Sequence, residues 1–452
     1  MMRLKRITFI AAVLLLNPAF ASAQDVWDTF RNRAQEERCE FVRQARKRYA
    51  DYLKDSWTLR RDSCMLQDPL RREDCKPVEL PPAAPPPRRS ATMLDAYTFP
   101  FYGDRPTVRL SSIPEIALDS VDEAGVAAAW EDLENRGCEE LLQDCLSLRS
   151  QRSLCDWAYA QMLDSLTCTV YPGRPSDQQL LFAFLMGRSG LDFRLGISGG
   201  SLVALVGIEE PVYSQIFFNF GDVRFYPLRP LPHDIRICEA NYPDTRPMTL
   251  RMQEVQVFPG GRVYTRHIEA ANGVTCDFRI GENQLRFLSS YPHTLCSIKA
   301  GAPTGPELEE CLYPVLKDRL NGLCKEDAVN VILGYVGSAS TYRTDHDNWG
   351  FEKWNFPEES CLYPSGDCED YAILFCRLVR DLVGLDCVLV HADINGSSPH
   401  LGAAVLFNQP VKGCVVHYDG HDYCYCEPVS RTAKAGEQRF TDFVITSIEP
   451  VN

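Results

Sequence analysis

The segment Tyr363–Phe375, "YPSGDCEDYAILF", places one cysteine among three acidic residues just before a run of apolar residues. Gly366 ends the turn that "YPS" begins, and Asp367 is a good N-cap residue. The apolar residues of "YAILFCRLVRDLVG" then recur at helical spacing until Gly384 ends the helix. Cys368 is therefore predicted in the first turn of a helix that leads into the strand "LDCVLVHA".

The first turn of a helix is a favourable position for a nucleophilic thiol. Unpaired N–H groups and the helix dipole lower the pKa of a thiol placed there, and the same N–H groups can hold an oxyanion. Asp370 follows Asp367 by three residues, in an arrangement close to a capping box. Because Asp367, Glu369 and Asp370 oppose ionisation of Cys368, a paired base is needed to form a useful thiolate.

Two further residues complete a candidate catalytic set. His400 opens the predicted strand "HLGAAVLF", whose small residues leave room for a neighbouring group. Glu427, in the short strand "YCYCEPVS", is suited to orient the imidazole of such a base. His391 and His417 are alternative bases, but the small residues that follow His400 do not follow His391.

The order of these residues resembles the transglutaminase-like branch of the papain-like cysteine enzymes. The family signature is a Gly-Asp-Cys helix start, a His that opens a strand and an Asp on the next strand. The matching residues here are Gly366, Asp367, Cys368, His400 and Glu427. The chain departs from the signature at Glu427, which is one methylene longer than the usual Asp but can still accept the imidazole N–H.

The resemblance covers about residues 325–430 and looks like a bacterial subgroup of exported or envelope-associated transglutaminase-like proteins. It includes a Tyr-x-x-Asp segment, here Tyr342 and Asp345, and an acidic Pro-Glu-Glu segment before the cysteine helix. Trp349, Trp354 and Tyr342 are candidates for the residue that completes the oxyanion hole.

The resemblance implies a papain-like catalytic core and thiol acyl chemistry on an amide. Cys368 would attack a peptide or side-chain carboxamide, His400 would carry the proton and Glu427 would hold the imidazole. Hydrolysis is the expected outcome, because water is abundant and nothing in the sequence marks an amine site. The competing hypothesis is a non-catalytic binding or scaffold protein. The expected partners are a protein or peptide substrate and, in the scaffold case, a component of the cell envelope.

No cofactor and no metal site are expected. The sequence has no P-loop, no dinucleotide-binding fingerprint and no zinc-ligand spacing. The "DHD" at residues 345–347 gathers possible ligands, and calcium on Asp367, Glu369 or Asp370 stays open.

The N-terminus is typical of an export signal. Basic residues precede the apolar run "FIAAVLLL", and the small residues of "ASAQ" predict a cut before Gln24. The run is too short to span a bilayer, and no later segment is long and apolar enough to do so. We therefore expect a periplasmic or secreted protein with no membrane span.

The charge and the cysteine content fit that compartment. A net charge of -14 argues against a nucleic-acid partner. Nineteen cysteines predict a disulfide framework, and the odd number leaves at least one thiol unpaired if the others pair within the chain. Cys39, Cys64 and Cys75 could staple the N-terminal segment.

The predicted fold class is α+β, with five segments along the chain. Residues 1–23 form the signal peptide, 24–75 a helical leader and 76–90 a proline-rich linker. Residues 91–304 form an N-terminal α+β region, and 305–452 form the catalytic domain, in which the cysteine helix packs on an antiparallel sheet.

Within the N-terminal region, four helical segments precede a series of strands. A hairpin is expected between 248–258 and 262–270, around "PGG". Further antiparallel strands are expected at 276–281 and 284–291.

One internal similarity suggests a repeat. "SDQQLLFAFLMGRSGLDFRLGI" parallels "GDCEDYAILFCRLVRDLVGLDCVLV", with Gln178 where the nucleophile would be. The N-terminal region is thus either a degenerate transglutaminase-like unit or an ordinary helix and strand that also follow Gly-Leu-Asp.

Overall fold

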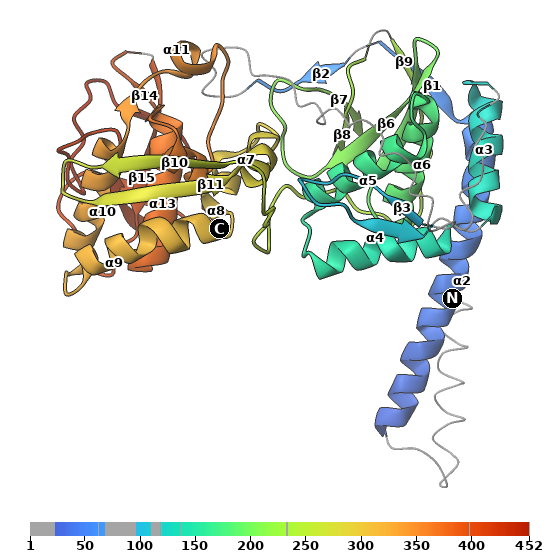
Figure 1. Cartoon of the computed structure of the whole chain (residues 1–452), viewed down its shortest axis with the longest axis horizontal. Coiled ribbons are helices and arrows are strands. Elements are labelled where there is room, and N and C mark those ends of the chain that lie inside the picture. The colour runs from blue at the N-terminus through green and yellow to red at the C-terminus, as the bar shows by residue number, and fades with distance from the viewer. Residues whose placement is uncertain are drawn as a thin grey trace.

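The structure is a computed structural model that describes residues 23–61, 63–67, 96–109, 118, 120–136, 138–231, 234–396 and 398–451. Signal residues 1–22, the proline-rich linker and Cys75 lie outside the described residues. Helices and antiparallel sheets are mixed along the chain, so the predicted α+β class is confirmed. Figure 1 shows two lobes, the first built from α2 to β9 and the second from β10 to β18.

The first lobe contains a seven-stranded sheet of order β1-β9-β5-β6-β8-β7-β2 and a small β3-β4 hairpin. Strand β6 is buried along almost its whole length, with α6 against it, because its sequence "SLVALVGI" is nearly continuous in apolar residues. Its elements are α2 (Ala23–Asp55), β1 (Trp57–Arg60), β2 (Cys64–Met65), β3 (Ala96–Thr98), β4 (Thr107–Arg109), α3 (Glu123–Arg136), α4 (Glu139–Gln151), α5 (Asp156–Val170), α6 (Pro175–Arg188), β5 (Phe193–Ser198), β6 (Ser201–Ile208), β7 (Ile216–Phe220), β8 (Val223–Pro227) and β9 (Ile235–Cys238).

The second lobe contains a five-stranded antiparallel sheet of order β16-β17-β15-β14-β18. Helix α13 is buried almost throughout and packs against β14 and β15, as predicted for the cysteine helix. Its elements are β10 (Val263–Glu269), β11 (Thr275–Gly281), α7 (Glu282–Ser289), α8 (Cys296–Gly301), the π-helical turn η1 (Leu308–Leu312), α9 (Tyr313–Leu320), α10 (Lys325–Ala339), β12 (Thr341–Tyr342), α11 (Asp345–Trp349), α12 (Pro357–Leu362), β13 (Ser365–Gly366), α13 (Cys368–Val383), β14 (Cys387–Ile394), β15 (Ser398–Val405), β16 (Val415–Tyr418), β17 (His421–Cys426) and β18 (Val444–Pro450).

The leader is only partly helical, which corrects the prediction for residues 24–75. After α2, the chain forms β1 and β2, which pair with β9 and β7 at opposite edges of the first sheet. A strand added at a sheet edge satisfies backbone groups that would otherwise need water, and this tertiary pairing is not visible in the local sequence pattern.

Two strand predictions in the connection between the lobes are wrong. Residues 248–258 contain no strand, and β10 pairs with β11 instead. Residues 284–291 lie mostly in α7, because Gln284, Phe287 and Leu288 are buried at the spacing of one helical face.

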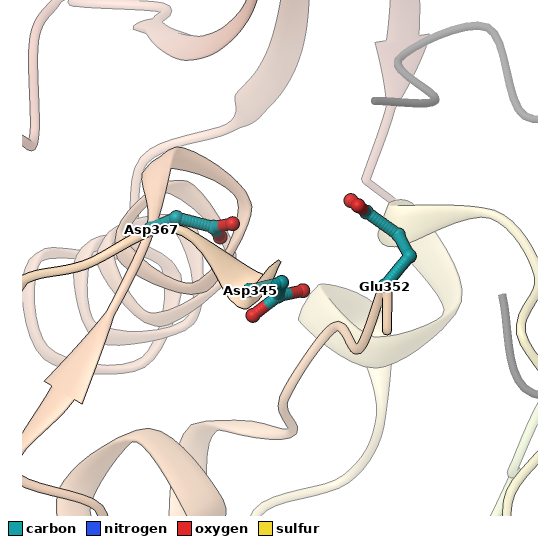
Figure 2. Close-up of side chains that lie close together, drawn as sticks. All are labelled: Asp345, Glu352 and Asp367. Carbon is teal, nitrogen blue, oxygen red and sulfur yellow. The ribbon is translucent and has the colours of Figure 1, made fainter. Parts of the chain in front are cut away.

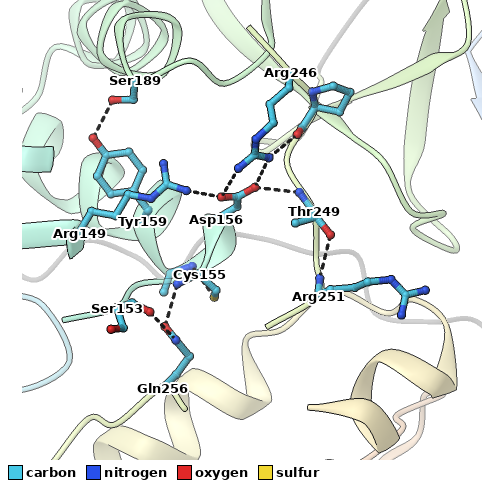
Figure 3. A network of polar contacts seen from close by, with 12 residues as sticks. Arg149, Ser153, Cys155, Asp156, Tyr159, Ser189, Arg246, Thr249, Arg251 and Gln256 are labelled. Atoms are coloured by element: carbon cyan, nitrogen blue, oxygen red, sulfur yellow. Dashed lines mark hydrogen bonds and ion pairs between the residues drawn. The ribbon is translucent and has the colours of Figure 1, made fainter. Parts of the chain in front are cut away.

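The buried carboxylate of Asp156 fastens the connecting segment to the first lobe (Figure 3). The carboxylate of Asp156, at the start of α5, accepts hydrogen bonds from Arg149 and from both terminal nitrogens of Arg246, the latter at 2.6 and 3.1 Å. It also accepts the backbone N–H of Thr249 at 2.9 Å. Four donors on one buried carboxylate fix the path of the chain as it leaves the first lobe.

The two large sheets share one strand order. Five strands of the first run β9-β5-β6-β8-β7, and the five of the second run β18-β14-β15-β17-β16, with a helix, α6 or α13, before the first hairpin. In each sheet the backbone carbonyl of the aspartate that ends a Gly-Leu-Asp triplet accepts the backbone N–H of the residue opposite it. Asp192 accepts from Gly207 at 3.0 Å, and Asp386 accepts from Leu406 at 2.9 Å. The parallel seen in the sequence thus extends to topology and register.

The predicted disulfide framework is not seen among the described cysteines, which form no disulfide. Many of the thiols are buried, and burial raises the pKa of Cys145 to about 12. Burial also raises the pKa of Cys387 well above its ordinary value, and its neighbour Cys376 adds to the shift.

Within the described part of the chain, every helix is too short or too polar to cross a bilayer.

Candidate active site

Cys368 is the first residue of α13, as predicted. Asp367 occupies the N-cap position, but its side chain makes no capping hydrogen bond. The predicted capping box is absent as well, because the carboxylate of Asp370 accepts the backbone N–H and the side-chain amide of Asn355 at 2.7 and 2.8 Å. Gly366 is required beside it, since a Cβ there would lie 2.5 Å from Asp370 Oδ2. The Gly-Asp-Cys motif thus fits a crowded helix start.

The thiol of Cys368 is buried, with 0% of the residue exposed. Its Sγ donates a hydrogen bond to Oε2 of Glu369 at 3.0 Å. This hydrogen bond exists only for the protonated thiol, so the arrangement holds Cys368 in its neutral form. Ionisation requires that the proton pass to another group.

His400 and Glu427 form a buried pair. Nε2 of His400 lies 2.9 Å from Oε2 of Glu427, and the two residues are 4% and 2% exposed. A carboxylate only accepts hydrogen bonds, so Nε2 carries the proton and Nδ1 is the basic nitrogen of the neutral ring. The contact that the sequence analysis expected between Glu427 and the imidazole is thus present, and the role of this pair in catalysis stays a prediction.

The two alternative histidines are engaged elsewhere. His391 Nε2 lies 3.0 Å from the Glu449 carboxylate, and His391 is paired in register with Leu401, next to His400 on β15. Neighbouring residues of a strand point to opposite faces of the sheet, so His391 lies on the face of Leu401 and His400 lies on the other face. His417 is exposed and pairs with Asp422 at 2.6 Å.

The structure joins two of the three predicted site residues, His400 and Glu427, directly, and it places Cys368 at the start of the helix that packs on the same sheet. His400 lies on β15, Glu427 directly follows β17, and these two strands are neighbours in the second sheet. Cys368 begins the helix that packs on β15.

The three aromatic candidates for the oxyanion hole differ in their contacts and exposure. Nε1 of Trp354 donates to Glu352 at 3.2 Å, so this indole N–H is already used. Nε1 of Trp349 is buried without a hydrogen-bond partner among the described residues. Tyr342 is 43% exposed, and its ring lies 6.4 Å from that of Tyr371.

Phe440 covers the imidazole. Its ring lies edge-on to the His400 ring, with centroids 4.8 Å apart. It belongs to the loop that connects β17 to β18. Since His400 is buried behind this ring, a substrate could reach the imidazole only if Phe440 moved.

A cluster of three buried acids adjoins the helix start (Figure 2). One carboxylate oxygen from each of Asp345, Glu352 and Asp367 lies within 4.8 Å of the others. They come from the start of α11, the loop after it and the N-cap of α13. The sequence hypothesis of a calcium site named Asp367 but missed Glu352, whose position depends on the loop between α11 and α12.

The electrostatics of the cluster favour a cation. Burial, with repulsion from Asp370, raises the pKa of Asp345 to about 9, and burial raises the pKa of Asp367 well above its usual range. Oδ1 of Asp345 and Oδ1 of Asp367 are buried and have no hydrogen-bond partner among the described residues. Carboxylate oxygens in this arrangement suit Ca²⁺ or another hard divalent cation.

Asp345, Glu352 and Asp367 are thus the residues that would hold a metal ion. A bound cation would offset the mutual repulsion of the acids and supply positive charge beside Cys368, which favours a thiolate. Of the other acids named in the sequence hypothesis, Glu369 accepts from Cys368 and Asp370 accepts from Asn355.

A scan against protein-family models finds no family that matches this chain, and a search of curated proteins finds no relative. The functional case therefore stands on the sequence motif and the geometry.

Proposed function

We propose that the second lobe is a transglutaminase-like cysteine enzyme with a papain-like core and a Cys-His-Glu triad. The observation that carries the proposal is the buried hydrogen bond between His400 and Glu427, on the sheet that packs against the helix begun by Cys368. A buried carboxylate that orients an imidazole is the usual support for a general base.

In the proposed mechanism, Nδ1 of His400 takes the proton of the Cys368 thiol. The thiolate attacks the carbonyl carbon of an amide, and backbone N–H groups at the start of α13 stabilise the oxyanion. His400 then returns the proton to the departing amine, which leaves a thioester on Cys368. Glu427 holds the imidazole in one tautomer and stabilises its charged form.

Release of the acyl group completes the cycle. Water, activated by His400, hydrolyses the thioester and restores the thiol. An amine in place of water would give transfer instead of hydrolysis, through the same three residues. We favour hydrolysis of a peptide or side-chain carboxamide, by a protein exported to the periplasm or the medium.

The direct test is selective labelling of the native full chain with iodoacetamide under mild reduction, read by peptide mass spectrometry. We expect Cys368 to be labelled ahead of buried thiols such as Cys145 and Cys361. The proposal fails if Cys368 stays unmodified while the protein remains folded.

The burial of Cys368 and its hydrogen bond to Glu369 favour one alternative, a scaffold protein that kept the fold without catalysis. Such a protein would bind its envelope partner equally well after Cys368→Ala or His400→Ala. An enzyme would lose turnover with either substitution and keep a normal fold.

We further infer that the first lobe is a second copy of the same core without a triad. Matching the two first hairpins from the Gly-Leu-Asp triplets onward pairs Ser201 with His400. Continuing across the next strands pairs Arg229 with Glu427. Neither Ser201 nor Arg229 can perform the role of its counterpart.

The nucleophile position of this copy also differs from Cys368. Counting back sixteen residues from the helix-ending glycines, Gly384 and Gly190, pairs Cys368 with Arg174, whereas the sequence alignment had paired it with Gln178. Neither residue is a nucleophile, so the first lobe is expected to be catalytically silent.

A further inference from the structure

The carboxylate of Glu427 has more partners than an imidazole alone requires. Its Oε2 accepts the hydroxyl of Tyr425 at 2.7 Å in addition to His400 Nε2 at 2.9 Å. Its Oε1 accepts the backbone N–H of Val429 at 3.2 Å. Three donors therefore hold both oxygens of a side chain that has one more rotatable bond than aspartate.

Tyr425 is well placed to fix this carboxylate. It precedes Glu427 by two residues, so both project to the same side of the chain at the end of β17. The residue is 0% exposed, and burial next to Glu427 raises the pKa of its hydroxyl far above the ordinary value. The hydroxyl therefore stays protonated and can only donate to the carboxylate.

Gly402, on the neighbouring strand β15, leaves space for the ring of Tyr425. A Cβ at Gly402 would lie 2.5 Å from the Tyr425 hydroxyl oxygen and 2.8 Å from its ring. The opposite side of the ring is supported by Phe443, with centroids 4.9 Å apart. The glycine two residues after His400 is thus needed for the position of Tyr425.

We propose that Tyr425 is a positioning residue of the catalytic site, which locks the longer Glu427 side chain against Nε2 of His400, and that Gly402 makes this lock possible. This proposal rests on the proposed triad. It explains how a glutamate can serve where the family signature has an aspartate. The extra methylene is compensated by a second hydrogen bond to the same oxygen.

The test compares Tyr425→Phe with Tyr423→Phe in the full chain at pH 7 and a fixed calcium concentration. Tyr423 lies on the same strand and is the matched control. The first readout is the rate of Cys368 alkylation by iodoacetamide. We expect Tyr425→Phe to lower the rate roughly five- to tenfold, as for the loss of one ordinary hydrogen bond, and Tyr423→Phe to leave it unchanged.

A double-mutant cycle separates positioning from a general effect on packing. In a Glu427→Gln background, Tyr425→Phe should cause little further loss, because the carboxylate that it positions is already gone. An equal loss in both backgrounds would overturn the proposal.

A spectroscopic readout covers the case in which a variant folds poorly. In protein with ¹⁵N-labelled histidine, the Nε2–H of His400 should give a downfield, slowly exchanging proton signal, assigned by its loss in His400→Ala. Tyr425→Phe and Gly402→Ala should both shift or broaden this signal. The proposal is overturned if the signal is present in wild type and unchanged in every variant that folds.

The outcomes also distinguish a failure of the proposed triad from a failure of the role proposed for Tyr425. If His400→Ala does not slow alkylation, the proposed triad itself is wrong. If His400→Ala slows it but Tyr425→Phe behaves like Tyr423→Phe, only the role of Tyr425 is wrong.

Discussion

At the scale of single residues, the local motif predicted which side chains form the candidate site, and tertiary contacts determine how these side chains are positioned. Cys368, His400 and Glu427 could be selected from sequence because their residue types, their order and the flanking small residues form a pattern. Tyr425 and Glu352 could not, because their contacts depend on strand register and on the course of a loop. The sequence offered one indirect signal, Gly402, two residues after His400, whose missing side chain is explained by the ring of Tyr425.

The acid cluster gives the first residue-scale prediction. Calcium should stabilise the folded protein, because the cation replaces repulsion among buried carboxylates with coordination. At a free calcium concentration about a hundredfold above Kd, the gain is about 2.7 kcal/mol, visible as a higher midpoint of thermal unfolding.

Substitutions localise this effect. Asp345→Asn should abolish the response to calcium and leave the calcium-free protein as stable as wild type or more so, since it removes a carboxyl whose pKa burial raises and which folding therefore forces to take up a proton. Asp347→Asn, an exposed acid on the same helix, should preserve the response. An identical calcium response in the wild type and in Asp345→Asn would rule the site out.

At the scale of elements, long periodic helices and apolar strands were predicted well. Helices α3 to α6 and strands β5 to β8 lie close to the expected helical segments and strands, because long helix-compatible stretches and continuous apolar runs are strong local signals. The errors fall on short segments where tertiary contacts decide. Residues 284–291 contain alternating apolar residues but form a helix under the connecting segment, and residues 248–258 are held by side-chain hydrogen bonds instead of a partner strand.

The loop over the site gives an element-scale prediction. Phe440→Ala should increase the rate of Cys368 alkylation a few-fold, because it removes the ring that lies against His400. Phe443→Ala is the control, since that ring supports Tyr425 instead and should not accelerate the reaction. Equal acceleration in both variants would point to general loosening of the loop rather than to a cover over the imidazole.

The buried carboxylate of Asp156 in the first lobe gives a second element-scale prediction. Asp156→Ala leaves the Thr249 N–H and the partly exposed Arg149 and Arg246 without their acceptor, so it should lower the free energy of unfolding by about 1–3 kcal/mol. Glu239→Ala breaks the half-exposed pair with Arg60 and should cost about 1 kcal/mol or less. Chemical unfolding of the full chain measures both, and a loss below 1 kcal/mol for Asp156→Ala would contradict the assigned role.

At the scale of the whole molecule, the two large sheets share one order of five strands, and from it we infer two related cores, of which one has a candidate triad. The sequence alone suggested the repeat from one helix and one triplet, and it could not show the shared order of five strands, because that order arises from pairing between distant segments. Cys368, His400 and Glu427, the residues of the proposed triad, all lie in the second lobe.

The silent first lobe can be tested by substitution at its matched positions. Ser201→Ala and Arg229→Ala should leave Cys368 alkylation within about twofold of wild type. Arg229→Ala should reduce stability, because it leaves the buried carboxylate of Asp164 without the two hydrogen bonds of 2.7 and 2.8 Å that Arg229 provides. A loss of thiol reactivity in folded Ser201→Ala protein would show that the first lobe contributes to catalysis.

The measurement that most directly tests the central claim is the rate of Cys368 alkylation at pH 7 in the wild type, His400→Ala and Glu427→Gln proteins. If His400 ionises the thiol and Glu427 orients His400, both substitutions should slow the reaction, the first by about a hundredfold and the second by at least tenfold, with unfolding midpoints close to wild type. Equal rates in all three folded proteins would contradict the triad and leave Cys368 as a buried structural thiol.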